Sequence, residues 1–244
     1  MTYFVQQNKI KNQSGFTLIE LVTVIVILGI LSVGASSFLK FGAQIFVEAT
    51  DRDKILSSAR FAIERLNREI RAAVPNSARV LLSGTCLEFT PIAHSFVYID
   101  IPVSPDPDAN TVTLVPSITS FTAVESDNYS VVVYPLNNDD VYQTIGDSKV
   151  YPLKTGDFSG GGTPHTLTFF NDISFAEDST TQRLFIMKTS VMYCHENATE
   201  LVRYTIDSHH ADGSINGQSN RALMAEDLTG FTVNAGTGTR QRNG

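Results

Sequence analysis

Glu20 is the side chain best placed for chemistry in this sequence, because it is the only charged residue between Phe16 and Leu39. An ionised carboxylate inside an apolar helix costs several kcal/mol unless a cation pairs with it. The nearest downstream cation, Lys40, lies about 30 Å away along a helix axis. The expected chemistry of Glu20 is therefore ion pairing with a group from another molecule, not catalysis.

The two cysteines, Cys86 and Cys194, are the next candidates, and both fall in segments expected to be strands. An isolated pair in an oxidising compartment favours a disulfide. A bridge closing so long a loop contributes about 4 to 5 kcal/mol by the chain-entropy model. Two buried free thiols are the alternative. A catalytic thiol is disfavoured although His195 follows Cys194, because adjacent strand residues point to opposite faces.

Three other polar groups are weak candidates for a metal site. Asp106–Asn110 begins like a calcium loop, but Thr111 stands where an EF-hand needs glycine and Ser117 where it needs a bidentate glutamate. Asn137–Asp140 has the composition of a hairpin loop. The adjacent histidines at 209 and 210 have poor geometry for sharing one ion. The sequence predicts no metal site and no cofactor.

Composition and motifs also exclude several classes of function. G-x-S-x-G, H-E-x-x-H and a phosphate-binding glycine loop are absent, so we predict that the chain is not an enzyme. The formal net charge is −7 at neutral pH, and no basic cluster with interleaved aromatic residues occurs outside the helix described below. The sequence therefore predicts no nucleic-acid binding.

The elements that must position Glu20 begin with a membrane-length helix at residues 16–39. Apolar and small residues occupy nearly every face of it, so it must be buried in lipid or among other helices. Its rise of about 36 Å is enough to cross a hydrocarbon core of about 30 Å. A secretory signal peptide is the alternative, but the run is long and no A-x-A-like cleavage site follows it. Lys9 and Lys11 place the N-terminus in the cytoplasm.

The helix is predicted to continue through residues 40–74. Apolar residues recur at steps of three and four, which gives one stripe for packing on a sheet: Leu56, Ala59, Ile63, Leu66, Ile70 and Ala73. Charged residues at i,i+4 spacing occupy the other faces, namely Arg60 with Glu64, Glu64 with Arg68, and Arg65 with Glu69. Pro75 ends the helix, because its ring and missing N–H forbid continuation.

Residues 75–244 change to short β-branched and aromatic runs separated by turn residues, which predicts one mostly antiparallel sheet domain. The fold class is therefore α+β, with a long N-terminal helix on a β-rich domain. The candidate strands are Arg79 to Leu82, Cys86 to Phe89, Phe96 to Ile101, Val112 to Val115, Val131 to Tyr134, Thr166 to Phe170, Leu184 to Met187, Val191 to Cys194 and Leu201 to Ile206.

Gly15-Phe16-Thr17-Leu18-Ile19-Glu20 before the apolar run resembles the class III signal of type IV prepilins and of type II secretion pseudopilins. The resemblance implies a pilin-like fold, a leader at residues 1–15, and cleavage by a prepilin peptidase between Gly15 and Phe16. It also implies N-methylation of Phe16, and pairing of Glu20 with the N-terminal amine of a neighbouring subunit. The implied partners are major and minor pilins, through the helix, and the inner-membrane assembly platform. The implied location is the inner membrane, single-pass with a periplasmic domain, and then the pilus.

Residues outside the leader narrow the resemblance to larger minor pilins and J-type pseudopilins. These are the segments 58–71, 201–204 and 222–231. Major pilins usually have a proline where this chain has Ser37. Segments 73–77 and 86–92 look most like the O-type minor prepilins of the mannose-sensitive haemagglutinin (MSHA) pilus, which implies a role in initiating or capping a fibre. A type II secretion pseudopilin and a pilus-tip binding module are the alternatives. Such domains are expected to have further strands beyond residue 233, so a truncated C-terminus is one hypothesis that the resemblance raises.

Overall fold

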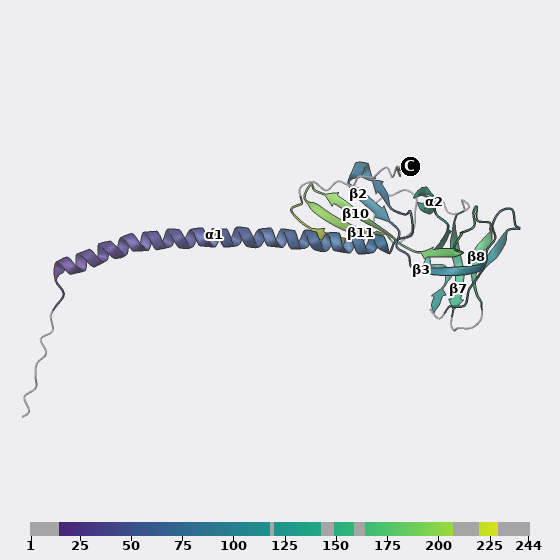
Figure 1. The fold of residues 1–244 in the computed structure, drawn as a ribbon, viewed down its shortest axis with the longest axis horizontal. Coiled ribbons are helices and arrows are strands. Elements are labelled where there is room, and N and C mark those ends of the chain that lie inside the picture. Colours follow the sequence, from purple (N-terminus) through teal and green to yellow (C-terminus); the bar gives the residue numbers. More distant parts are fainter. Residues whose placement is uncertain (1–14, 118–119, 143–148, 159–163, 207–219, 229–244) are drawn as a thin grey trace, which may run out of the picture. The chain divides into compact units, whose positions relative to one another are not determined.

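The computed structural model describes residues 15–117, 120–142, 149–158, 164–206 and 220–228. The chain divides into two compact units, residues 1–54 and residues 55–244. The long helix α1, Leu18–Arg71, contributes to both units. The second unit also contains every β-strand that the structure describes (Figure 1). The predicted α+β class is confirmed: a long N-terminal helix packs on antiparallel sheet.

α1 begins and ends close to the predicted positions, with local causes at each end. The backbone N–H of Glu20 donates to the side chain of Thr17, which stands just before the first turn. At the other end the N–H groups of Ala72 and Ala73 bond three residues back, so the last turn tightens. The helix therefore stops at Arg71. The predicted end, Val74, was three residues too late. Val74 instead donates its N–H to Thr90.

The C-terminal part of α1 lies beside a five-stranded antiparallel sheet of order β1-β2-β10-β11-β12 (Figure 1). Its strands are β1 (Arg79–Leu81), β2 (Cys86–Phe89), β10 (Ser190–Glu196), β11 (Glu200–Ile206) and β12 (Asn220–Ala225). A short 3-10 turn, η1 (Leu82–Gly84), connects β1 to β2. One face of this sheet receives the helix.

The other strands form a second sheet that closes on itself. Its order is β5-β7-β6-β9-β3-β4-β8, and β8 also pairs with β7, so β7, β6, β9, β3, β4 and β8 make a closed ring to which β5 is added. The strands are β3 (His94–Asp100), β4 (Ala109–Leu114), β5 (Phe121–Ala123), β6 (Ser130–Val133), β7 (Val150–Phe158), β8 (His165–Ile173) and β9 (Arg183–Met187). We call this ring the barrel. Closure removes the free edges that an open sheet would have.

The interior of the barrel is filled by side chains that alternate along its strands. The residues of this core include Phe96, Tyr98, Val112, Leu114, Phe121, Val131, Val133, Leu153, Phe158, Leu167, Phe169, Phe175, Leu184 and Ile186. Several of its aromatic rings meet at an edge, as Tyr151 and Phe175 do at 90°. The interior is therefore a packed core and not a channel.

The barrel is inserted into the five-stranded sheet. It occupies the chain between β2 and β10, and these two strands pair directly with each other from Phe89↔Val191 to Cys86↔Cys194. Residues 75–244 thus contain two sheets, where the sequence predicted one. All nine predicted strands are present, whereas three further strands, β5, β7 and β12, were missed. β7 contains Pro152 and Gly156, which are unfavourable strand residues.

A separate cluster of buried side chains joins the barrel to the helix–sheet part. It contains Val74, Val132, Val141, Tyr142, Val150 and Met187. Val141 and Tyr142 come from the short helix α2 (Asp139–Tyr142). The guanidinium of Arg79 in β1 lies 3.7 Å from the ring centroid of Tyr142 and forms a 2.6 Å ion pair with the buried Glu88 of β2. The sequence pattern did not predict this contact between the barrel and the helix–sheet part.

Candidate functional site

Gly15, Phe16 and Thr17 precede α1 and lie outside its helical turns. Phe16 is 81% exposed, and among the described residues no atom apart from those of its chain neighbours lies within 4 Å of the position a Cβ would take on Gly15. The Gly15–Phe16 peptide bond is therefore in an accessible, non-helical segment. Such segments are the preferred sites of proteolytic cleavage.

Glu20 lies in the first turn of α1, where the helix dipole favours a negative charge. Its backbone carbonyl accepts a hydrogen bond from the hydroxyl of Thr23 at 3.0 Å. Its carboxylate makes no ion pair with any residue that the structure describes. One subunit thus presents an accessible carboxylate at the start of an apolar helix, which can accept a cation from outside the described chain.

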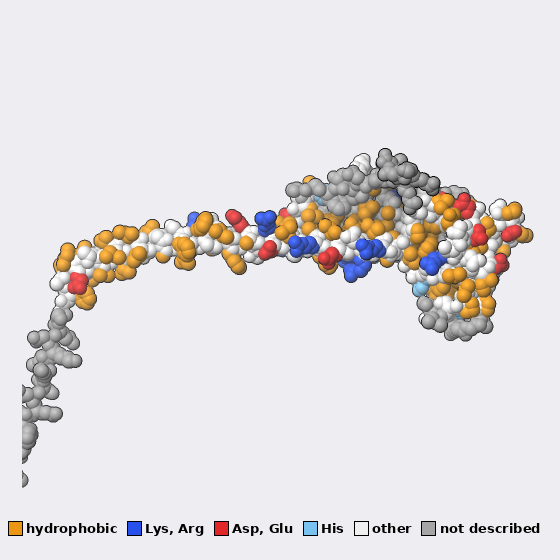
Figure 2. Space-filling model, in the orientation of Figure 1, with side chains coloured by type: hydrophobic (Ala, Val, Ile, Leu, Met, Phe, Trp, Pro, Cys, Tyr) orange, Lys and Arg blue, Asp and Glu red, His pale blue; other side chains and the backbone are white. Residues whose placement is uncertain are grey.

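The first part of α1 exposes apolar side chains on all sides, and no residue of the helix before Ala62 is buried. α1 is long and apolar enough to cross a membrane, and its most apolar window has no buried residue. Figure 2 shows hydrophobic side chains covering this part with few charges, and Lys, Arg, Asp and Glu becoming frequent further along. Several hydroxyl groups within it bond to the helix's own carbonyls, as Ser32 donates to Leu28 at 2.7 Å and Ser36 to Ser32 at 2.7 Å. The surface suits lipid or other apolar helices.

The second part of α1 packs on the five-stranded sheet, although not through the whole predicted stripe. Ala62, Leu66, Ile70 and Ala73 contact a cluster formed by Phe89, Val191, Tyr193, Leu201, Met224 and Ala225. Ile63 and Leu56 are 57% and 44% exposed, so their predicted place in the stripe is wrong. The covered face is rotated from the predicted one. The apolar pattern missed this rotation because the covered face includes a polar residue, Glu69.

Glu69 anchors the helix to the sheet through three donors. It accepts from Arg65 Nε at 2.9 Å, Arg203 Nε at 3.0 Å and the hydroxyl of Tyr193 at 3.1 Å. Burial by itself would raise the pKa of Glu69, but the hydrogen bonds from Arg65 and Arg203 outweigh it and hold the pKa below its ordinary value. Burial and the neighbouring Glu69 raise the pKa of Tyr193 to about 12. The network thus fixes the rotation of α1 on β10 and β11.

Of the three predicted ion pairs on α1, the structure forms Arg65 with Glu69. Glu64 has no ion pair with Arg60 or Arg68 among the residues that the structure describes. These two arginines are exposed. All three pairs have the same i,i+4 spacing, so the sequence could not distinguish them. The pair that forms, Arg65 with Glu69, is the one that packing on the sheet partly buries.

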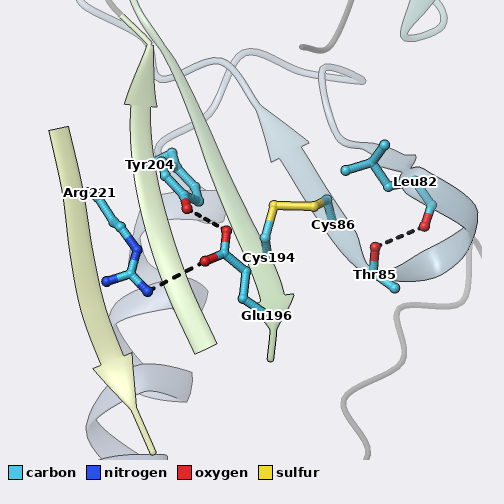
Figure 3. Close-up of a disulfide and its surroundings, with 7 residues drawn as sticks. All are labelled: Leu82, Thr85, Cys86, Cys194, Glu196, Tyr204 and Arg221. Atoms are coloured by element: carbon cyan, nitrogen blue, oxygen red, sulfur yellow. Dashed lines mark hydrogen bonds and ion pairs between the residues drawn. A yellow bond between two sulfur atoms is a disulfide. The ribbon is translucent and has the colours of Figure 1, made fainter. Parts of the chain in front are cut away.

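A disulfide joins Cys86 and Cys194, which are cross-strand partners in β2 and β10 (Figure 3). Their Cα atoms are 4.2 Å apart. Both side chains belong to a buried cluster with Met192, Val202 and Ile206. The neighbouring Glu196 accepts from Tyr204 and from Arg221, at 3.4 Å in the latter case (Figure 3). The covalent bond therefore ties together the two strands that flank the barrel insertion, at the end of their pairing opposite Phe89 and Val191, where the chain leaves and rejoins the sheet.

The other sequence candidates fall in separate places. Asp106 and Asp108 are exposed in the β3–β4 connection. Asp140 accepts from the N–H groups of Leu136 and Asn137 and from Lys149, so it organises its own turn. The histidines at 209 and 210 lie outside the described residues. Within the part of the chain that the structure describes, no group of three or more His, Cys, Asp or Glu side chains is placed to hold a metal ion.

Comparison with known families gives one match, which covers the start of the chain. Residues 10–36 match the family described as the prokaryotic N-terminal methylation motif. Neither a curated protein nor a solved structure matches the chain. The matched segment contains Gly15, Phe16 and Glu20, and it supports a type IV pilin-like or pseudopilin subunit. The motif implies processing by a prepilin peptidase and assembly with other pilins.

Proposed function

We propose that this chain, which carries a prepilin-type methylation motif, is a minor pilin-like subunit that initiates or caps an MSHA-like type IV pilus, with no catalysis of its own. The observation that carries the proposal is the place of Glu20. It lies in the first turn of an exposed apolar helix, inside the matched segment, with no ion pair among the described residues. Such a charge is costly in a membrane unless a partner supplies a cation.

Processing would create that cation. A prepilin peptidase would hydrolyse the Gly15–Phe16 bond, which lies in an accessible segment outside α1. The new amino group on Phe16 would then be methylated and would carry a positive charge. Glu20 would become the fifth residue of the mature chain. Two charges of opposite sign would stand near the same end of every processed subunit.

Assembly would then join these charges between subunits. Glu20 of one subunit would accept from the N-terminal ammonium of its neighbour, an interaction strengthened by the low dielectric of the surroundings. Packing of the exposed apolar part of α1 against neighbouring helices would supply cohesion. The carboxylate would set the register, because an unpaired charge would penalise every other alignment.

The membrane-anchored part of this proposal rests on the helix and the motif together. The Cys86–Cys194 disulfide further supports a location of the β-rich part in an oxidising compartment, which is the periplasm in a bacterial cell. We propose that the protein is held in the inner membrane by a single span, with this part in the periplasm, and then enters the pilus.

Two alternatives use the same motif. A J-type pseudopilin of a type II secretion system would be processed identically. A tip-located binding module is favoured by a specific observation, the barrel inserted between β2 and β10, since an insertion adds surface to the helix–sheet scaffold. Loss of the external fibre on gene deletion supports the pilus subunit, whereas loss of a secreted enzyme with fibres intact supports the pseudopilin.

The first experiment is N-terminal sequencing and intact-mass measurement of the membrane-fraction protein, expressed with and without a prepilin peptidase. We expect a peptidase-dependent start at methylated Phe16. An intact Met1 under both conditions would overturn the proposal. A second variant, Glu20→Val, should still insert and be processed but should lose ordered incorporation into the fibre. Thr23→Val, one turn further along the same helix, is the matched control and should assemble normally.

A further inference from the structure

The outward side of α1 in the folded unit carries arginines without ion pairs. Arg60, Arg68 and Arg71 are exposed. Because helix positions advance about 100° per residue, these arginines lie on the side opposite the buried Ala62. No ion pair reaches any of the three among the residues that the structure describes. Arg65, which points toward the sheet, is paired with Glu69.

Two further residues complete this surface. Phe61 is 56% exposed and Glu64 lies between the arginines along the helix. We call Arg60, Phe61, Glu64, Arg68 and Arg71 the basic strip. It has three cations and one anion, and it combines arginine with an exposed aromatic ring. Arginine and aromatic residues are enriched at the centres of protein interfaces.

The barrel has the opposite charge. Its chain from β3 to β9 contains twelve acidic and three basic residues, so it carries more negative charge than the whole protein's −7. Exposed carboxylates gather where β3 and β8 end and β4 begins: Asp100, Asp106, Asp108, Asp172, Glu177 and Asp178. We call these six residues the acidic end. Val103 bridges to Phe175, and Ala109 pairs with Ile173, so the two segments that supply the six residues lie side by side.

Only part of the acidic end is neutralised within the chain. Lys149 pairs with Glu177 and also with Asp140. Asp178 accepts from the hydroxyl of Tyr98. Asp100, Asp106, Asp108 and Asp172 form no ion pair with the other described residues. A chain with this distribution carries both halves of a complementary contact and does not join them internally.

We propose that the basic strip is a docking face, and that its occupant is the acidic end of the barrel of a second copy of this chain. The inference rests on the proposed function, because it concerns the contacts that an assembling subunit makes outside the membrane. The two surfaces differ, so the contact is heterologous: one copy contributes its basic strip and the other its acidic end. Charge complementarity of this kind steers encounter and selects orientation.

The test uses cysteine cross-linking of two full-length copies in membranes. One tagged copy carries Asn67→Cys, beside the basic strip, and the other carries Asn110→Cys, beside the acidic end; both positions are exposed. The native cysteines are already joined to each other. We expect a disulfide-linked product that contains both tags. A copy with Thr122→Cys, exposed on β5 at the other end of the barrel, is the matched control and should give little product.

Charge reversal decides whether electrostatics makes the contact. Arg60→Glu, Arg68→Glu and Arg71→Glu together should lower the cross-linked yield about tenfold. Asp100→Lys, Asp106→Lys and Asp108→Lys in the other copy should restore it. Lys154→Glu with Arg183→Glu, which reverses exposed cations of the barrel, should not lower it. Formation of the native disulfide in every variant shows that the fold is kept.

Three results would overturn the proposal: no cross-link between copies, a yield unchanged by reversal of the strip, or failure of the swapped charges to restore it. Binding of the strip to anionic vesicles without a cross-link between copies would indicate a lipid partner and would also overturn it. The N-terminus of the same samples separates this inference from the proposed function. A methylated Phe16 without the cross-link leaves the function in place and removes the docking contact.

Discussion

Cys86 and Cys194 lie directly opposite each other across β2 and β10, and the disulfide between them closes a loop of 108 residues that contains the whole barrel. The two cysteines hold the strands from which the barrel leaves and to which it returns. The pairing of β2 with β10 is therefore the longest-range strand contact that the five-stranded sheet needs. Without the covalent link, this pairing would have to be held by packing and hydrogen bonds alone.

Replacing both cysteines, as Cys86→Ala with Cys194→Ala, should lower the free energy of unfolding by about 4 to 5 kcal/mol on the chain-entropy model. The effect should be local to the five-stranded sheet, with faster amide hydrogen exchange in β2 and β10. The barrel core should exchange at its usual rate. Faster exchange in the barrel with β2 and β10 unchanged would contradict this account.

Removal of the barrel should leave the helix–sheet scaffold folded. Thr90 and Ser190 follow and precede the paired residues Phe89 and Val191, so an Asn-Gly turn between them can replace residues 91–189. The shortened chain should still form the native disulfide and, if the proposed function holds, acquire a methylated Phe16. It should be less stable, because Val74 loses its cover. Non-reducing mass spectrometry measures both modifications, and free thiols would show that the barrel is needed for the scaffold.

Glu69→Ala should destabilise the contact of α1 with the sheet by about 2 to 3 kcal/mol, because Arg65, Arg203 and Tyr193 lose a charged acceptor. Urea unfolding of the full chain in detergent measures the change. Glu64→Ala, five residues earlier on the outward side, is the control and should change stability by less than about 0.5 kcal/mol. Equal effects of the two substitutions would show that the network contributes nothing.

The barrel should lose stability on mild acidification. Burial lowers the pKa of His94 from its ordinary 6.5, and its ring lies 4.5 Å from that of Phe121. The unfolded chain therefore binds the proton more tightly than the folded one. The stability linked to neutral His94 is complete above about pH 6.5 and is lost as the pH falls below that value. Glu69 and Asp140 also have lowered pKa values, but they act only in more acidic solution.

Thermal unfolding followed between about pH 7.5 and 5.5 tests this prediction. His94→Gln, which stays neutral throughout, should reduce the dependence of the melting temperature on pH. An identical dependence in the variant and in the natural sequence would exclude His94 as the source.

Gly156→Ala should destabilise the barrel by about 1 to 3 kcal/mol through overpacking. A Cβ at this position in β7 would come within 2.9 Å of Leu167 Cδ2 and 3.2 Å of Phe121 Cε1, both in the buried core. Thr155→Ala, at the neighbouring exposed position, is the control. Chemical unfolding, with hydrogen exchange of β7 and β8, measures the stability of both variants. A neutral or stabilising effect of Gly156→Ala would show that Leu167 and Phe121 can shift to accommodate the added methyl group.

Strands with a continuous β-branched or aromatic pattern were predictable, and the three missed strands, β5, β7 and β12, show the limit of that pattern. β7 reads Val-Tyr-Pro-Leu-Lys-Thr-Gly-Asp-Phe, in which Pro152 and Gly156 resemble turn residues. Its partners make it a strand: Ser130 pairs with Pro152 on one side, and Leu167 pairs with Gly156 on the other. Local propensity is overridden here because both neighbouring strands supply hydrogen bonds and side-chain contacts.

The sequence by itself determined the α+β class, the membrane-length helix and the position of Glu20 within it, because these depend on residue types along one continuous segment. Tertiary structure alone decided that the β-rich part contains an inserted closed barrel, that α1 turns Glu69 and not Ile63 toward the sheet, and that Cys86 faces Cys194. Each of these depends on strands far apart in the sequence meeting in one register. Hydrophobic periodicity states which side of an element is apolar, but it does not state which distant element covers that side.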